Sequence, residues 1–200
     1  YPYLCGAGFF GDATPSSQKS MRCSGLCPAG YTCPSGTTQP SPCEIGSFCT
    51  VGSSVATRCP PGTHSTARNL TSASQCLDCP RGHVCARGIK WPCGRNTYND
   101  IEGASDRRAC YICPSNSQTT TEAAVALQSC LCDSSYFQNA HANGSFSCEV
   151  CPDGSTCFDP GSRLDNIPLM RGYWRESVNS SLIFRCPDAA RDSGCKGGTG

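Results

Sequence analysis

The distribution of apolar and polar residues along the chain predicts short strands and turns rather than long elements. Glycine follows a Cys-Pro-x step at Gly30, Gly62, Gly82 and Gly154, where a turn with positive φ suits it, and short strands are expected on either side. The one helical patch is "TEAAVALQSC", Thr121–Cys130, which predicts one or two turns. No stretch reaches the roughly 18 apolar residues that a membrane-spanning helix needs.

The hydrophobic pattern changes from about Pro160, where "LMRGYWRES", the polar "VNSS" and "SLIFRC" predict two strands around a turn. Apolar side chains gather here and at the N-terminus, and the neighbouring modules offer them no obvious cover. We interpret eight of them as candidate assembly contacts: Tyr1, Tyr3, Phe9, Phe10, Tyr173, Trp174, Ile183 and Phe184. The other interpretation, that each cluster only packs on its own neighbouring module, stays open.

Cysteine spacing repeats along the chain. Sixteen residues separate Cys59 from Cys76, and the same spacing recurs twice before a loop of fifteen, while short C-x5-C units recur between these loops. Crossed bonds such as Cys27–Cys43 and Cys33–Cys49 fit the short units as well as local bonds do. Pairing the cysteines in order makes every bridge local: Cys5 with Cys23, Cys27 with Cys33, Cys43 with Cys49, Cys59 with Cys76, Cys79 with Cys85, Cys93 with Cys110, Cys113 with Cys130, Cys132 with Cys148, Cys151 with Cys157, and Cys186 with Cys195.

Composition strengthens the disulfide interpretation, because 20 of the 200 residues are Cys, with 21 Gly, 15 Pro and only 8% aromatics. Thiols at this density pair in oxidising compartments, so we expect a secreted or cell-surface protein. We predict a small disulfide-rich fold, mostly irregular with short β-strands, built as an elongated string of cysteine-rich modules ending in a β-hairpin. The expected domains are an N-terminal cysteine-rich segment (1–58), a cysteine-rich repeat (59–92), further repeats (93–159) and the hairpin segment (160–200).

The overall charge gives no case for nucleic acid or an anionic membrane as a partner, since the formal net charge is +1 and like charges run no longer than a pair. The N-terminus lacks a basic leader followed by an apolar core. We therefore expect either that a signal peptide has been removed or that the sequence is part of a longer chain.

Three N-glycosylation sequons lie in polar, turn-like contexts, at Asn69 ("NLT"), Asn143 ("NGS") and Asn179 ("NSS"). We expect all three to be exposed on loops and at least two to carry glycans. The Ser/Thr/Pro-rich stretches Ala13–Ser20 and Ser35–Pro42 suit either O-linked glycans or plain polar linkers.

Catalytic motifs are absent, so we predict no enzyme, no cofactor and no metal site. The C-x-x-C steps lie between a closing loop and an opening one, which favours structural disulfides over zinc or redox chemistry. His64, His83 and His141 each stand alone in polar loops and are expected to be solvated. Trp174 lies between Arg171 and Arg175, which suits either cation-π stacking with a sugar site or simple hairpin packing.

The segments "CPPGTHSTARNLTSASQCLDCPRGHVC" and "CYICPSNSQTTTEAAVALQSCLCDSSYF" resemble cysteine-rich repeats of the ephrin-receptor-like type, which are distant relatives of tumour-necrosis-factor-receptor modules. The resemblance covers roughly Cys23 to Cys157. The flanking segments look like parts of large cysteine-rich surface proteins of algae and other protists. The resemblance implies extended, non-catalytic extracellular architecture and carries no ligand.

Two functions follow as hypotheses. The first is a glycosylated structural subunit of a surface filament, appendage or coat that assembles head to tail, because two different apolar surfaces at opposite ends make an open, propagating contact. The second is the ectodomain of an adhesion or signalling receptor that binds a protein ligand. The expected partners are further copies of the chain or other extracellular proteins.

Overall fold

The computed structural model describes residues 4–11, 23–187, 195 and 197–198, and the chain forms two compact units. Unit 1 comprises Tyr1–Pro92 with Ile101–Ala109, and unit 2 comprises Cys93–Asp100 with Cys110–Gly200. Nine two-stranded antiparallel sheets follow one another along the described residues, which contain no α-helix. The predicted fold class is therefore confirmed: the protein consists of small, disulfide-rich modules that are mostly irregular and contain short β-strands.

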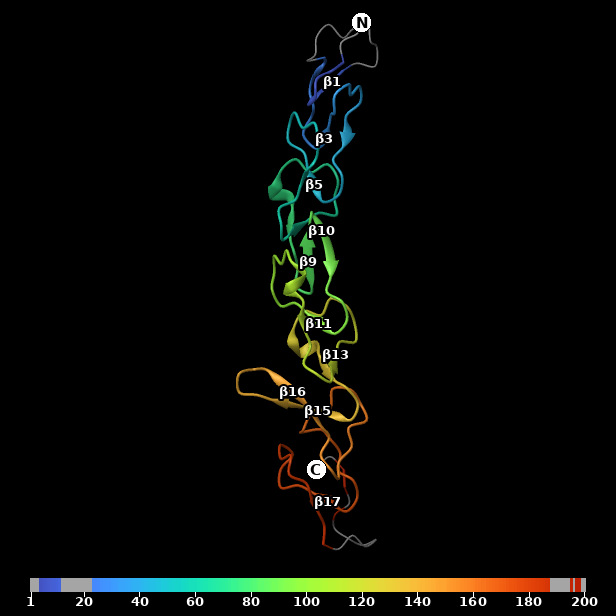
Figure 1. The fold of residues 1–200 in the computed structure, drawn as a ribbon, viewed down its shortest axis with the longest axis vertical. Helices are drawn as coiled ribbons and strands as arrows, with labels where there is room; N and C mark the ends of the chain where they lie inside the picture. Colours follow the sequence, from blue (N-terminus) through green and yellow to red (C-terminus); the bar gives the residue numbers. More distant parts are fainter. Residues whose placement is uncertain (1–3, 12–22, 188–194, 196, 199–200) are drawn as a thin grey trace. The chain divides into compact units, whose positions relative to one another are not determined.

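Unit 1 contains five hairpins (Figure 1). Their strand pairs are β1 (Phe9–Phe10) with β2 (Gly25–Leu26), β3 (Tyr31–Thr32) with β4 (Ser41–Pro42), β5 (Ser47–Phe48) with β6 (Thr57–Arg58), β7 (Thr63–His64) with β8 (Leu77–Asp78), and β9 (His83–Ala86) with β10 (Ile89–Pro92). The described residues of the unit also include two 3-10 turns, η2 (Ala73–Gln75) and η3 (Arg107–Ala109).

Unit 2 contains four hairpins and one 3-10 turn, η4 (Leu127–Ser129). The strand pairs are β11 (Thr97–Tyr98) with β12 (Tyr111–Ile112), β13 (Ser117–Gln118) with β14 (Leu131–Cys132), β15 (Tyr136–Ala140) with β16 (Phe146–Val150), and β17 (Tyr173–Trp174) with β18 (Phe184–Arg185). The β15–β16 hairpin is the longest and projects from the side of this unit (Figure 1).

A tight turn follows the cysteine that opens most hairpins, and the third residue after that cysteine has positive φ. The four glycines predicted for this place have positive φ, of 84° at Gly30, 81° at Gly62, 77° at Gly82 and 85° at Gly154. A backbone bond closes the turn, as from Tyr31 N to Pro28 O at 3.2 Å. In other hairpins Asn96, Asn116 and Ser135 occupy the same place with φ of 63°, 59° and 74°, since a short polar side chain tolerates this conformation better than most.

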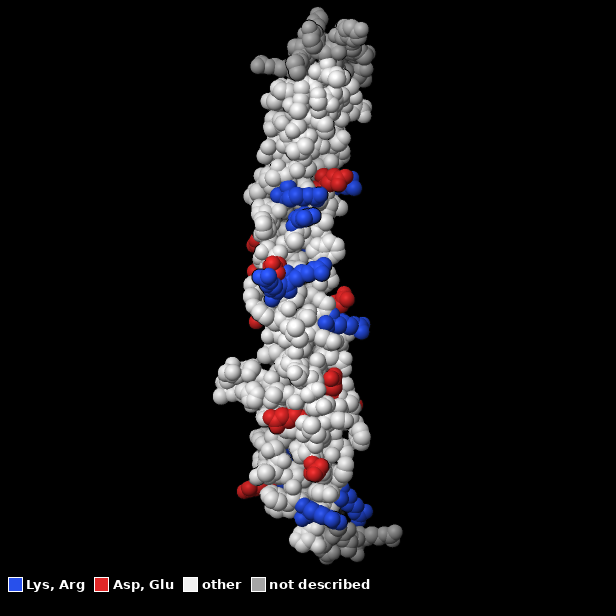
Figure 2. Space-filling view, viewed as in Figure 1, with Lys and Arg blue, Asp and Glu red and all other residues white. Residues whose placement is uncertain are grey.

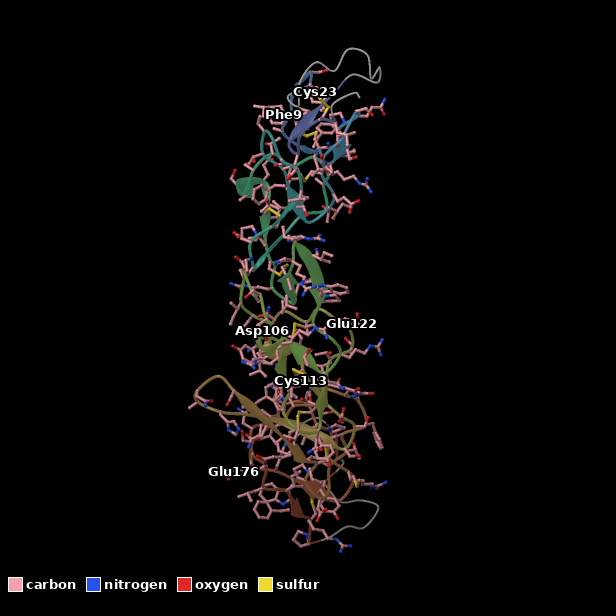
Figure 3. The ribbon with its side chains drawn as sticks, turned by 45° about the horizontal axis from the view of Figure 1, so that its top comes forward. Phe9, Cys23, Asp106, Cys113, Glu122 and Glu176 are labelled. Carbon is pink, nitrogen blue, oxygen red and sulfur yellow. A yellow bond between two sulfur atoms is a disulfide. The ribbon has the colours of Figure 1, made fainter. Side chains whose placement is uncertain are left out.

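The structure contains ten disulfides, which join the cysteines in sequence order (Figure 3). The bridges are Cys5–Cys23, Cys27–Cys33, Cys43–Cys49, Cys59–Cys76, Cys79–Cys85, Cys93–Cys110, Cys113–Cys130, Cys132–Cys148, Cys151–Cys157 and Cys186–Cys195. The crossed alternative for the short units is not the pairing found.

Nine of the ten bridges are of two kinds, spanning 6 or 16–18 positions, and Cys186–Cys195 spans 9. Long ones such as Cys59–Cys76 and Cys113–Cys130, each spanning 17 positions, tie the opening turn to the base of the second strand. Short ones such as Cys27–Cys33 and Cys151–Cys157, each spanning 6 positions, close a turn on itself. The cross-links therefore hold individual turns and hairpins, and no bridge joins distant parts of the chain.

Main-chain hydrogen bonds join hairpins that are neighbours in space, and we call this set the backbone ladder. In unit 1, Gly30 N donates to Cys49 O at 2.8 Å, and Asn69 N donates to Cys43 O at 2.9 Å. Farther along, Gly62 N donates to Cys85 O at 3.1 Å, and Gly103 N donates to Cys79 O at 2.8 Å. The ladder requires very close approach of backbones, which is why glycines recur along it.

Half-cystines form most of the interior. Among the described residues, fourteen of the twenty-one buried hydrophobic residues are cysteines, and the remainder are single aliphatic or aromatic side chains. In the described part of unit 2, one cluster of buried side chains joins Phe137, Cys157 and Ile167. Burial of apolar side chains is therefore sparse, and cross-links carry a large share of the stability.

The predicted helical patch Thr121–Cys130 contains one turn, of the 3-10 type. Only Leu127–Ser129 forms a 3-10 turn, because Ala123 has a φ of 59° and Ala124 makes a parallel bridge to Tyr98, which breaks any helical path. The patch is also not unique, since η2 and η3 are similar turns. The predicted C-terminal hairpin is present as β17 and β18, with strands of two residues each.

Candidate interaction surfaces and glycosylation sites

The first candidate surface lies on the β1–β2 hairpin of unit 1. Phe9 pairs with Leu26 across the hairpin; Phe9 and Phe10 are half-buried, whereas Leu26 is 54% exposed and Leu4 is 71% exposed (Figure 3). The side chains of Leu4 and Leu26 lie over the bare backbones of Gly36 and Gly52. The predicted contacts Tyr1 and Tyr3 lie outside the described residues, so the surface described here consists of Leu4, Phe9, Phe10 and Leu26.

The second candidate surface lies on the β17–β18 hairpin of unit 2. Trp174 and Phe184 are opposite each other in the register, with ring centroids 5.4 Å apart and planes tilted by 33°, and they are 45% and 47% exposed. Tyr173 is on the other face of its strand, where its ring covers Gly154 so closely that a Cβ there would collide with it. Ile183 is half-buried. Of the four predicted contacts, Trp174 and Phe184 therefore form the exposed pair.

A cleft of about 390 Å³ adjoins the exposed pair. Its walls include Leu169, Trp174, Val178 and Gly197. Leu169 and Gly198 exchange two backbone bonds, N to O at 2.8 and 3.0 Å, which hold the C-terminal segment against the hairpin. Glu176 and Ser177 also line the cleft, so the exposed aromatic pair borders a cleft of mixed apolar and polar character.

Arg175 does not stack on Trp174, so the cation-π interpretation of this pair is wrong. The guanidinium turns inward, where Nη1 donates to Leu164 O at 2.5 Å and Nη2 donates to Ile167 O at 3.4 Å. Its Nε is buried without a hydrogen-bond partner in the described residues. Burial lowers the pKa of the Arg175 guanidinium, although the Asp165 carboxylate opposes that shift. Arg175 thus anchors the loop that contains Leu164 and Ile167, and it also lines the cleft beside Trp174.

Two of the three sequons are exposed as predicted. Asn143 is at the tip of the projecting β15–β16 hairpin, and its Oδ1 accepts bonds from Ser145 N at 3.0 Å and Ser145 Oγ at 2.6 Å. Asn179 is exposed beside a polar cleft of about 400 Å³ that Gln138, Arg163 and Asp165 also line. Both side chains therefore belong to exposed residues, as attachment of a glycan requires.

The prediction that Asn69 is exposed is wrong. Asn69 is half-buried, has a φ of 61° and is part of the backbone ladder. Its Nδ2, the atom to which a glycan would attach, donates to Gly30 O at 3.0 Å. The sequence signal is ambiguous here because asparagine both begins a sequon and tolerates positive φ.

The histidine interpretation needs one correction. His64 is buried, 6% exposed, and its Nδ1 lies 3.2 Å from Leu77 O, because the second strand of its own hairpin covers it. In the described part of the chain, no group of three or more His, Cys, Asp or Glu side chains has a metal-binding arrangement. The same residues include no helix long and apolar enough to cross a membrane.

Between residues 58 and 162 the charges are unevenly distributed over two stretches that no run of like charge marks in the sequence, whereas residues 93–100 and 163–187 carry both signs (Figure 2). The basic stretch, residues 58–92 and 101–109 of unit 1, has seven Lys or Arg and three Asp or Glu. The acidic stretch, residues 110–162 of unit 2, has five Asp or Glu and no Lys or Arg. Counting charges module by module would have found this separation.

Neither a scan against protein-family models nor a search of curated proteins finds a match to the chain. The features of the chain that bear on its function are the exposed aromatic pair, the sequons, the disulfides and the distribution of charge.

Proposed function

We propose that this chain is a non-catalytic, glycosylated structural protein of the cell exterior, a subunit of a surface filament, appendage or coat that assembles head to tail. The single observation that carries the proposal is the exposed Trp174–Phe184 pair beside its cleft. Aromatic side chains in contact with an uncovered cleft are typical of a binding surface, since their burial by a partner supplies most of the free energy of association. Complete pairing of the cysteines suits an oxidising, extracellular compartment.

The partner that the proposal assigns to this surface is the β1–β2 hairpin of another copy, with Leu4, Phe9, Phe10 and Leu26. The two surfaces differ, so their contact is heterologous and can propagate into a linear or helical array. Both hairpins are two-stranded, so their outer edges can also accept a strand from the next copy. The resemblance to ephrin-receptor-like repeats supports an extracellular, non-catalytic role but says nothing of the partner.

The second candidate is a receptor ectodomain that binds a protein ligand through the same aromatic pair. A receptor of this kind would stay monomeric when released, whereas a filament subunit would associate without any ligand. Glycosylated, disulfide-intact protein should therefore be studied by light scattering and electron microscopy over a range of concentrations.

The deciding variant replaces Trp174 and Phe184 with Ser. Loss of the two aromatic contacts is expected to weaken association by about 30-fold for each side chain, since hot-spot side chains contribute about 2 kcal/mol each. The matched control is Val150→Ser, which removes an apolar side chain that is 71% exposed and distant from the aromatic pair in sequence. Wild-type protein that remains monomeric at high concentration would overturn the filament proposal and favour the receptor.

A further inference from the structure

The basic stretch has seven Lys or Arg against three Asp or Glu, a net charge of +4, and the acidic stretch has five Asp or Glu and no Lys or Arg, a net charge of −5. All seven Lys and Arg of the basic stretch are exposed, and within the described residues the one ion pair among them joins Arg81 to Glu102 at 3.8 Å. In the acidic stretch Glu122, Glu149, Asp153 and Asp159 are exposed and Asp133 is half-buried. None of these five forms an ion pair with a described residue.

Such a separation has a physical consequence. Like charges within a stretch repel one another, and the field they sum to reaches beyond the surface to attract a partner of opposite sign. A partner that presented only negative charge, such as an anionic polysaccharide, would engage the basic stretch and leave the acidic one without a role. A second copy of this chain presents both charges, and so it accounts for both stretches at once.

We propose that the basic stretch of one copy binds the acidic stretch of another. Each copy carries both stretches, so the contact is heterologous and can repeat from copy to copy. The inference goes beyond the proposed function, because it names a second contact that uses neither Trp174 nor Phe184. Electrostatic pairing would fix which segments of neighbouring copies lie together and would accelerate their encounter, while the apolar contact would supply affinity.

The test uses two triple variants of the whole glycosylated chain. The first, the acidified variant, carries Arg58→Glu, Lys90→Glu and Arg107→Glu; the second, the basified variant, carries Glu122→Lys, Asp153→Lys and Asp159→Lys. All six side chains are exposed, and none makes a side-chain hydrogen bond or ion pair in the described structure. Association is followed by sedimentation velocity at about 0.02 M and about 0.5 M salt, since the Debye length falls from roughly 20 Å to roughly 4 Å over that range.

Each variant alone is expected to associate at least about tenfold more slowly than wild type at low salt, and high salt should remove the difference. An equimolar mixture of the two should associate again, because the intact acidic stretch of the acidified variant meets the intact basic stretch of the basified one. Neutral versions, with Gln in place of Arg and Lys and with Gln or Asn in place of Glu and Asp, should be intermediate. Peptide mapping of the disulfides checks that every variant is folded.

The proposal would be overturned if either variant associated at the wild-type rate, or if the mixture did not regain a wild-type rate of association. It would also be overturned if only the acidified variant associated more slowly, which would point to an anionic polysaccharide as the partner of the basic stretch. The test is independent of the apolar contact. If Trp174→Ser with Phe184→Ser abolishes stable assembly while the remaining encounter still depends on salt and on these six charges, the electrostatic contact stands by itself. If the aromatic variant has no effect but the mixture experiment succeeds, the proposed head-to-tail contact fails and this one holds.

Discussion

Replacing Gly30 with Ala tests whether the backbone ladder stabilises unit 1 through close approach of main chains. Gly30 has a φ of 84°, and a Cβ there would lie 2.7 Å from Asn69 O and 3.3 Å from the carbonyl carbon. Four hydrogen bonds depend on that approach: Gly30 N to Cys49 O and Cys43 N to Gly30 O, both 2.8 Å, Asn69 N to Cys43 O at 2.9 Å, and Asn69 Nδ2 to Gly30 O at 3.0 Å.

The expected loss of stability has two parts. An alanine at positive φ costs about 1 kcal/mol after the entropy it removes from the unfolded chain is counted. The collision with Asn69 adds about 1–3 kcal/mol, as overpacking usually does, because the backbone carbonyl cannot swing away as a flexible side chain would. Gly30→Ala should therefore destabilise the contact by about 2–4 kcal/mol.

The matched control is Gly103→Ala in the same unit. Gly103 has a φ of 71°, but a Cβ there would meet nothing within 4 Å, so only the conformational cost of about 1 kcal/mol applies. Gly94→Ala, with ordinary φ and open space, should be nearly neutral. The difference between Gly30 and Gly103 isolates the close approach from the conformation.

Hydrogen exchange measured by mass spectrometry is the suitable assay, since disulfides keep global unfolding limited and local opening is what the ladder resists. Gly30→Ala should raise exchange at the amides of Gly30, Cys43 and Asn69 by about 30-fold or more, which corresponds to about 2 kcal/mol, whereas Gly103→Ala should leave those amides unchanged. Equal effects of the two substitutions at these amides would refute the reasoning.

Two further predictions concern single side chains. Asn143→Gln and Asn179→Gln should each lower the intact mass by one glycan. Asn69→Gln should leave the number of glycans unchanged and should instead speed hydrogen exchange at the backbone amide of residue 69. Loss of a glycan in the Asn69 variant would contradict the hydrogen-bonded position of Nδ2. Arg175→Lys should lower the stability of the loop that contains Leu164 and Ile167 by about 1–2 kcal/mol, because an ammonium cannot reach both carbonyls. Arg185→Lys, at an exposed position, is the control. Equal hydrogen exchange of that loop in both variants would show that the bonds of Arg175 contribute nothing to its stability.

Much of the fold is predictable because its constraints are local in sequence. Cysteine spacing indicates the pairing of Cys59 with Cys76, and the Cys-Pro-x-Gly step indicates the turn at Gly30, since both depend on residues a few positions apart. The backbone ladder is not predictable in this way. Its bonds join main-chain atoms of residues such as Asn69 and Cys43, which no side-chain pattern marks.

The candidate surfaces were predictable only as lists of apolar residues. The sequence indicates that Tyr173, Trp174 and Phe184 gather near one another, but the direction of each depends on strand register, which places Trp174 opposite Phe184 and turns Tyr173 onto Gly154. The direction of the Arg175 side chain is not predictable for a similar reason. The carbonyls of Leu164 and Ile167 that attract it belong to an irregular loop without a sequence signature.

The connections between paired strands differ widely in length, from the two residues Arg87–Gly88 in β9–β10 to residues 11–24 in β1–β2. Hairpins of such different size nevertheless form the same two-stranded antiparallel pairs. The connections that contain Asn69 and Gly103 belong to the backbone ladder, whereas residues 141–145, which join β15 to β16, are exposed or half-buried and make no bond to another hairpin. Changes of length or sequence should therefore be tolerated at the tip of β15–β16 and resisted where a connection also joins its neighbour.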